Sequence, residues 1–129
     1  MNKKKYVFTK SIEILERDFI GLMDTAIEGG AGYWCCIGND TPEWDVVREE
    51  YPDACIDELM YRILAKGESV ILIDEEDDDK QHELTMAKLL KGVQMTIDNG
   101  HWDGDVMHAD GIVGDCIFQY ALFDELIYG

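Results

Sequence analysis

Positive charge is scarce in this chain. Its 129 residues include only 11 Lys and Arg against 28 Asp and Glu, a formal net charge of −17, and no Lys or Arg occurs from Gly92 to Gly129. Such an acidic surface repels phosphate backbones and anionic lipids at long range. The sequence therefore predicts no direct nucleic-acid or membrane binding, and leaves basic protein surfaces, metal cations and neutral ligands as partners. Solubility alone would also explain the charge.

Long apolar runs are lacking as well. None approaches the roughly 20 residues that span a bilayer. The basic residues Lys3, Lys4 and Lys5 are followed by the mixed segment 6–11 rather than by a hydrophobic stretch, so no export signal is visible. We therefore expect a cytoplasmic protein, in which residues 1–8 form a flexible or edge segment.

Cysteine and serine are few, and their positions suit neither structural zinc nor nucleophilic catalysis. The four cysteines lack the paired spacing of a zinc site, and the neighbours Cys35 and Cys36 cannot form a disulfide within a regular strand. The only serines, Ser11 and Ser69, lie outside a Gly-x-Ser-x-Gly elbow. We expect free thiols, no resident cofactor and no enzymatic activity; the oligomeric state stays open.

Apolar residues nevertheless make up 47% of the chain and are spread along it, which predicts one folded domain over residues 1–129. Helical spacing occurs in 11–27, 53–67, 85–98 and 110–126, and Pro42 marks a shorter helix. Segments 33–37 and 69–73 are predicted strands. Gly29 and Gly30 are expected to end the first helix in a left-handed cap. The predicted fold class is α+β, a compact single domain with four to five helices packed on a small sheet of two to four strands.

The segment 74–79 is a run of six consecutive carboxylates. The desolvation free energy of six unpaired carboxylates would exceed the free energy that burial of a hydrophobic core gains. The sequence therefore predicts a solvated turn or a contact surface. More acidic side chains follow in the base-free last third of the chain. The predicted protein-interaction residues are Asp74, Glu75, Glu76, Asp77, Asp78, Asp79, Asp103, Asp105 and Asp110.

Potential metal ligands gather just before the last predicted helix. They are His101, Asp103, Asp105, His108 and Asp110. An EF-hand is excluded because the fifth position counted from Asp103 is Met107. A looser divalent-cation site remains one interpretation. The other is a capped, solvated loop, because Asp is common at helix starts.

A ligand-binding hypothesis centres on Glu28, Tyr33 and Trp34. Glu28 precedes two glycines and an aromatic pair, so it could lie beside an apolar wall that raises the pKa of its carboxyl. The aromatic rings could stack on a planar ligand. The alternative is a helix-end Glu28 that faces water.

Three stretches of the chain carry a family resemblance. They are 25–30 with Tyr33-Trp34, 84–92, and the tail Gln-Tyr-Ala-Leu-Phe-x-Glu-Leu-x-Tyr-Gly at 119–129. Together they resemble a family of small uncharacterised proteins encoded by bacteriophages and prophages. The resemblance implies a phage setting, with the host cytoplasm as location, and no mechanism. By analogy, small acidic phage proteins often act by binding, among them anti-CRISPR and anti-restriction proteins whose carboxylates mimic DNA phosphates.

Three functional hypotheses follow. The first is an interaction protein that binds a basic surface of a host defence or nucleic-acid-binding protein and inhibits that protein, as nucleic-acid mimics do. The second is a small-ligand binder, such as a sponge for a nucleotide-derived signal. The third is a metal-dependent enzyme that uses the loop 101–110.

Overall fold

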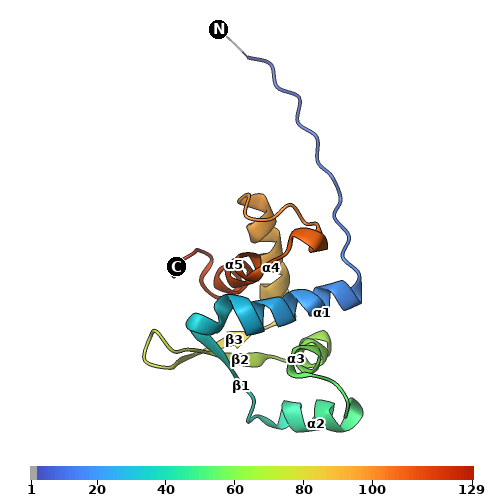
Figure 1. The fold of residues 1–129 in the computed structure, drawn as a ribbon, viewed down its shortest axis with the longest axis vertical. Coiled ribbons are helices and arrows are strands. Elements are labelled where there is room, and N and C mark those ends of the chain that lie inside the picture. The colour runs from blue at the N-terminus through green and yellow to red at the C-terminus, as the bar shows by residue number, and fades with distance from the viewer. Residues whose placement is uncertain (1–2) are drawn as a thin grey trace.

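Helices and one small sheet surround a single core in the computed structural model, which describes residues 3–129 (Figure 1). In chain order the elements are α1 (Glu16–Thr25), the π-helix η1 (Ala26–Gly30), the 3-10 helix η2 (Ala31–Tyr33), β1 (Cys35–Gly38), α2 (Pro42–Glu50), α3 (Ile56–Ala65), β2 (Val70–Asp74), β3 (Lys80–Leu84), α4 (Met86–Asp98), the 3-10 helix η3 (Val106–His108) and α5 (Gly111–Phe123). The predicted α+β class is confirmed.

The sheet is antiparallel, in the order β1-β2-β3. Val70 and Leu72 of the central strand face the core, while Ile71 and Ile73 lie half-buried on the other face. The edge strand β3 was not predicted. Its sequence Lys-Gln-His-Glu-Leu has no Val, Ile, Thr, Phe, Tyr or Trp, and a polar, exposed composition is common at sheet edges. Its pairing with β2 therefore depends on the hairpin rather than on apolar patterning.

The helices α4 and α5 pack closely against each other because glycine lies at their contact. A Cβ on Gly92 would lie 2.3 Å from the backbone oxygen of Ile117 and 2.9 Å from Cβ of Ala121. Helix α5 is buried on nearly every side from Val113 to Ala121, as expected for a helix that is apolar all round. No helix in the described part of the chain is both long and apolar enough to cross a membrane.

The predicted left-handed cap at Gly29 and Gly30 is wrong. Gly30 has φ −101°, and the chain there continues as the π-helix η1. Glycine is needed for a different reason, since a Cβ on Gly30 would lie 2.3 Å from the backbone oxygen of Gly111. This close approach joins the end of the first helical segment to the start of α5.

Two predicted helix boundaries also change. Helix α1 begins at Glu16 rather than at Ser11, and residues 3–11 form an extended arm that leads away from the domain (Figure 1). Helix α5 ends at Phe123, where Asp124 adopts the left-handed conformation at φ 61°. The tail 125–129 then returns along the domain. Of the predicted flexible or edge segment 1–8, residues 3–8 are extended and exposed, and residues 1 and 2 lie outside the described residues.

Candidate functional site

The β2–β3 hairpin carries the densest negative charge on the surface. Its turn consists of Glu75, Glu76, Asp77, Asp78 and Asp79, and all five are exposed. Asp78 and Asp79 adopt left-handed conformations, with φ 51° and 56°, which Asp tolerates better than most residues. None of the five carboxylates forms an ion pair with a described residue. The acidic turn, residues 75–79, therefore presents uncompensated charge in a defined loop.

Asp74 does not belong to this exposed surface, which corrects the prediction of a solvated run beginning there. It is the last residue of β2 and is only 1% exposed. The hydroxyl of Tyr128 donates to its Oδ2 at 2.6 Å, and the backbone N–H of Glu76 donates to its Oδ1 at 3.0 Å. The strand's period of two places Asp74 on the same inward face as Leu72, so it ties the hairpin to the tail.

A second carboxylate, Asp115 of α5, is held in the same way. Its Oδ2 accepts from the hydroxyl of Tyr33 at 2.6 Å, and its Oδ1 accepts from Trp34 Nε1 at 2.7 Å and from Gln119 Nε2 at 2.9 Å. Partial burial and the hydrogen bond to Asp115 raise the pKa of Tyr33 to about 12. Neutral donors, rather than cations, satisfy this carboxylate.

Gln119 extends the network to the tail. Its side-chain oxygen accepts from the backbone N–H groups of Ile127 and Tyr128 at 2.7 and 2.9 Å. Its amide group donates to Asp115 and to the backbone oxygen of Tyr128 at 3.2 Å. The side chain is nearly fully buried, and its oxygen and amide nitrogen both have partners. We call Asp74, Asp115, Gln119 and Tyr128 the tail network.

The tail network was not predicted from the amino-acid sequence. The register of β2 could have indicated an inward Asp74, because Val70 and Leu72 set the buried face. Asp115 and Gln119 lie four residues apart on one helix face and could have been paired. Their partners Tyr33 and Trp34 lie more than 80 positions away, and no local pattern indicates that contact.

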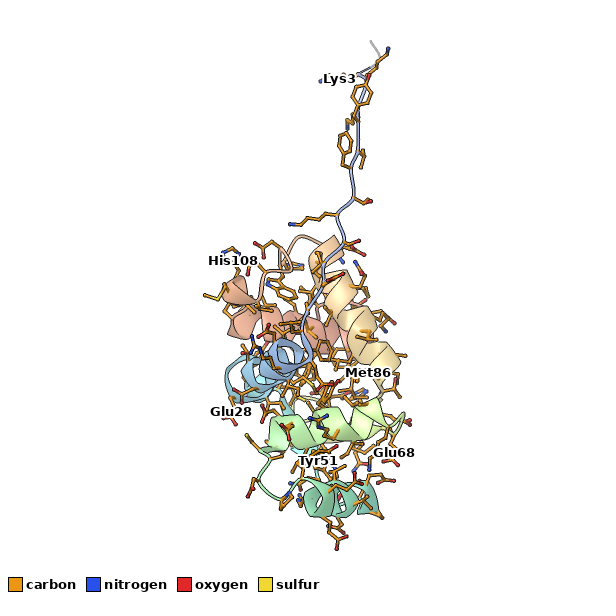
Figure 2. The ribbon with its side chains drawn as sticks, turned by 90° about the vertical axis from the view of Figure 1, so that its right-hand side faces the viewer. Lys3, Glu28, Tyr51, Glu68, Met86 and His108 are labelled. Atoms are coloured by element: carbon orange, nitrogen blue, oxygen red, sulfur yellow. The ribbon has the colours of Figure 1, made fainter. Side chains whose placement is uncertain are left out.

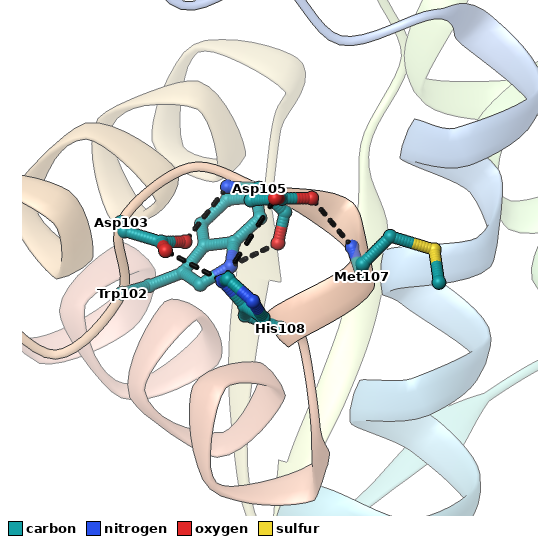
Figure 3. A network of polar contacts seen from close by, with 5 residues as sticks. All are labelled: Trp102, Asp103, Asp105, Met107 and His108. Atoms are coloured by element: carbon teal, nitrogen blue, oxygen red, sulfur yellow. Dashed lines mark hydrogen bonds and ion pairs between the residues drawn. The ribbon is translucent and has the colours of Figure 1, made fainter.

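The loop 101–110 is organised by its own hydrogen bonds (Figure 3). His108 Nδ1 lies 2.6 Å from Asp103 Oδ2, and the backbone N–H of Asp105 donates to Asp103 Oδ1 at 2.9 Å. These bonds lower the pKa of Asp103, with the Asp105 N–H as the larger cause, and the Asp103 carboxylate raises the pKa of His108. Trp102 anchors the loop, because its Nε1 donates to the backbone oxygen of Asp105 at 2.8 Å.

The five predicted metal ligands do not converge. Asp103, Asp105 and His108 lie together, but His101 Nε2 faces the hydroxyl of Tyr120 at 3.1 Å and Asp110 caps α5 by accepting from the N–H of Val113. Across residues 3–129, no group of three or more His, Cys, Asp or Glu side chains is arranged to hold a metal ion. The geometry favours the capped, solvated loop.

The predicted ligand residues are also separated. Glu28 is exposed on η1 (Figure 2), so the predicted apolar wall is absent. Trp34 is 0% exposed and packs against Phe123 and Tyr128, with ring centroids 5.4 and 5.3 Å apart. Trp34 has no free face for a ligand, which corrects its prediction as a stacking residue. Tyr33 remains half exposed, and its hydroxyl is bonded to Asp115.

The two predicted acidic regions do not form one surface. The hairpin projects at the side of the sheet near the tail, whereas the loop 101–110 lies at the other end of α5, beside the root of the arm (Figure 1). Asp103 and Asp105 line a groove with residues 10–15. The predicted interaction residues thus divide into an acidic turn and a separate loop. Every residue of the turn is exposed and has no ion-pair partner among the described residues, whereas Asp103 and Asp105 of the loop lie within ion-pair distance of His108.

Comparisons of the chain with protein-family models, with curated proteins and with solved structures found no match. The structure gives the three resembling stretches a common physical role, since they all pack on α5. Gly30 and Tyr33, Gly92, and Gln119 with Tyr128 each contribute a close backbone approach or a hydrogen bond there. The phage resemblance stays a prediction.

Proposed function

We propose that this protein is a small acidic interaction protein of phage type, which binds and inhibits a host defence or nucleic-acid-binding protein in the host cytoplasm. The observation that carries the proposal is the acidic turn, with five consecutive exposed carboxylates that have no ion-pair partner among the described residues. Inhibitors that act as anti-CRISPR or anti-restriction proteins are members of this functional class.

The carboxylates of the acidic turn repel one another and oppose the compact state. The one basic residue that directly follows them in the sequence is Lys80. A basic partner surface would replace this repulsion with several attractive contacts and would accelerate encounter. The turn is short and joins two paired strands, and Asp78 and Asp79 adopt left-handed conformations in it; a loop held in this way would lose little entropy on binding.

Because the acidic turn is separated from the loop 101–110, the two regions do not form one surface for a partner. Mimicry of an extended nucleic-acid strand would need a continuous row of carboxylates, and the two regions lie at different ends of the domain (Figure 1). We therefore assign the partner contact to the hairpin. Mimicry of nucleic-acid phosphates is then confined to the carboxylates of residues 75–79.

The test replaces Asp77, Asp78 and Asp79 by Asn, which keeps the shape of the side chains and tolerates left-handed backbone. Partners captured from host lysate by the unchanged protein and by this variant are quantified by mass spectrometry at low and high salt. We expect the variant to lose the major basic partner. Raising the salt should also release it from the unchanged protein, because the screening length falls from about 10 Å at 0.1 M to about 3 Å at 1 M.

A matched control carries Glu49→Gln, Asp53→Asn and Glu68→Gln. These residues are exposed and lie outside the hairpin, and the control changes the net charge by the same amount. It should capture the partner as the unchanged protein does. Equal capture by the hairpin variant, with both variants folded by circular dichroism, would contradict the proposal; equal loss in both variants would reduce the interaction to bulk charge.

A further inference from the structure

The extended arm, residues 3–11, is the segment of the described chain with the least internal support. Every residue in it is exposed, and Tyr6, Val7 and Phe8 are 79, 83 and 90% exposed. No residue from 3 to 14 makes a hydrogen bond within the described chain, and Figure 2 shows the arm standing clear of the domain. Fixing an extended backbone costs about 1–2 kcal/mol of conformational entropy per residue. An ordered arm of this kind therefore needs contacts with a surface that offset this cost.

The arm differs in chemistry from the rest of the molecule. It contains Lys3, Lys4, Lys5 and Lys10 and no acidic residue, which leaves seven of the 11 Lys and Arg residues against all 28 acidic residues elsewhere. In an extended chain, alternate side chains share a side. Tyr6 and Phe8 therefore lie on the same side as Lys4 and Lys10, so one side of the arm has an aromatic centre with basic ends.

A surface of matching character lies at the root of the arm. A groove of about 460 Å³ has an apolar floor formed by Ile14, Phe19, Leu90, Val93 and Ile97, and Lys10, Ser11, Ile12 and Gln94 complete its lining. Leu90 is 51% exposed there, which leaves a large apolar side chain open to solvent on α4.

An acidic groove adjoins the same segment of chain. It has a volume of about 560 Å³ and is lined by Glu13, Asp18, Asp103 and Asp105, among others. Residues 10–12 and 14 line both grooves. The two grooves together offer an apolar floor for aromatic side chains and carboxylates for lysines.

We propose that the arm of one copy docks in the grooves of a second copy of this chain, reciprocally, to form a two-fold dimer. Such an interface requires one surface to be complementary to another surface on the same chain, and the basic aromatic arm and the acid-rimmed apolar groove meet that condition. Nine extended residues span about 30 Å at about 3.3 Å per residue, which exceeds the roughly 20 Å length of a 13-residue helix such as α4.

A second copy suits the groove better than the chain's own arm. To reach its own groove, the arm would have to reverse direction at Thr9-Lys10-Ser11, where Ser11 is the one residue of a turn-favouring type and Gly, Pro, Asn and Asp are absent. The arm instead continues outward from its root (Figure 1). Two copies related by a two-fold axis at the root need no reversal.

The test measures self-association of the full chain by sedimentation equilibrium over a wide concentration range. Tyr6→Ser with Phe8→Ser removes the aromatic centre of an arm that makes no internal hydrogen bond, and Leu90→Lys alters the groove at an exposed position. We expect each variant to raise the dimer dissociation constant at least about tenfold, because buried aromatic and apolar anchors dominate interfaces. The control Val46→Lys, at a half-exposed position on α2, should dimerise like the unchanged protein.

Mixing the arm variant with the groove variant makes the test specific to exchange. Their heterodimer contains one intact arm-to-groove contact, whereas neither homodimer contains any. The mixture should therefore associate more tightly than either variant alone. A monomeric unchanged protein would overturn the proposal, whether the arm stays free, folds back or serves another partner. So would an arm variant that dimerises normally, or a mixture no tighter than its components.

Discussion

Asp74 and Asp77 lie three positions apart in one acidic run, yet the structure treats them in opposite ways. Asp74 is 1% exposed and accepts hydrogen bonds from Tyr128 and from the N–H of Glu76. Asp77 is exposed and unpaired within the described chain. The difference teaches that a carboxylate's burial in this protein depends on the donors that reach it, and not on the charge of its neighbours.

In a chain with few cations, neutral hydrogen-bond donors stabilise a carboxylate that is removed from water. Asp115 repeats the solution of Asp74 with a phenol, an indole and an amide. Hydrogen bonds to an ionised group are stronger than those between neutral groups, and they offset the desolvation of the carboxylate. The tail network therefore stabilises the fold, while the acidic turn is left free for contacts outside the chain.

The largest effect should come from breaking the tail network at Asp115. Asp115→Ala leaves the N–H of the fully buried Trp34 without an acceptor and removes the bonds from Tyr33 and Gln119. We expect a loss of about 3 kcal/mol in the free energy of unfolding, measured by urea denaturation. Asp115→Asn, which keeps one acceptor oxygen, should lose less.

Asp77→Ala is the matched control for that experiment, because it removes an equal charge from the acidic turn. Its free energy of unfolding should change by no more than about 0.5 kcal/mol, as for other surface substitutions. Equal losses at Asp115 and Asp77 would remove the distinction between structural and free carboxylates.

An intermediate effect should appear in alkali, where the donors of the network titrate. The hydrogen bond to Asp74 raises the pKa of Tyr128 from 10.0 to about 12, and the pKa of Tyr33 is raised to about 12 as well. Because the folded-state pKa exceeds the unfolded-state value, the stabilisation by each phenol is complete below pH 10 and is lost as the pH rises through 12. Phenolate absorbance should show these two tyrosines titrating late.

Tyr128→Phe isolates one of the two phenols. The variant should be less stable at neutral pH, because Asp74 loses a donor, and its stability should fall less steeply between pH 10 and 12. Tyr51→Phe is the control, because it keeps the ring that Arg62 contacts and removes a hydroxyl that has no hydrogen bond to a described residue, so both properties should stay unchanged. A Tyr128→Phe variant with the same alkaline decline as the unchanged protein would show that the bond to Asp74 does not control folding in alkali.

The sequence predicted the helical framework because apolar periodicity and capping residues are local signals. Pro42 begins α2 as predicted, and the helix predicted over 85–98 is α4, which Thr85 caps by accepting from the N–H of Lys88. Local sequence patterns could not predict the hydrogen bond that holds Asp74, because Asp74 and its donor Tyr128 are 54 positions apart. Gly30 was recognised as special but given the wrong reason, because its neighbour Gly111 is supplied by tertiary packing. The acidic run was predicted as a solvated turn or contact surface over 74–79, and its first residue, Asp74, is buried instead.

The smallest effect concerns the loop 101–110, where His108 and Asp103 form an exposed pair. The hydrogen bond that His108 donates to Asp103 raises the pKa of His108, and the N–H of Asp105 together with His108 lowers the pKa of Asp103. The stabilisation through His108 is present below pH 6.5 and is lost as the pH rises through its folded-state pKa. That through Asp103 is present above pH 3.8 and is lost as the pH falls through its lowered pKa.

Histidine titration followed by NMR checks this pair. Asp103→Asn should return the His108 midpoint toward its ordinary value, and Asp105→Asn should lower it less, because Asp105 Oδ2 lies 3.9 Å from His108 Nδ1 whereas Asp103 Oδ2 lies at 2.6 Å. Added salt should weaken both effects, since the pair is exposed. A His108 midpoint that is insensitive to Asp103→Asn would mean that the Asp103 carboxylate does not hold His108, and that the loop is organised by Trp102 and by the backbone N–H groups that its carboxylates accept from.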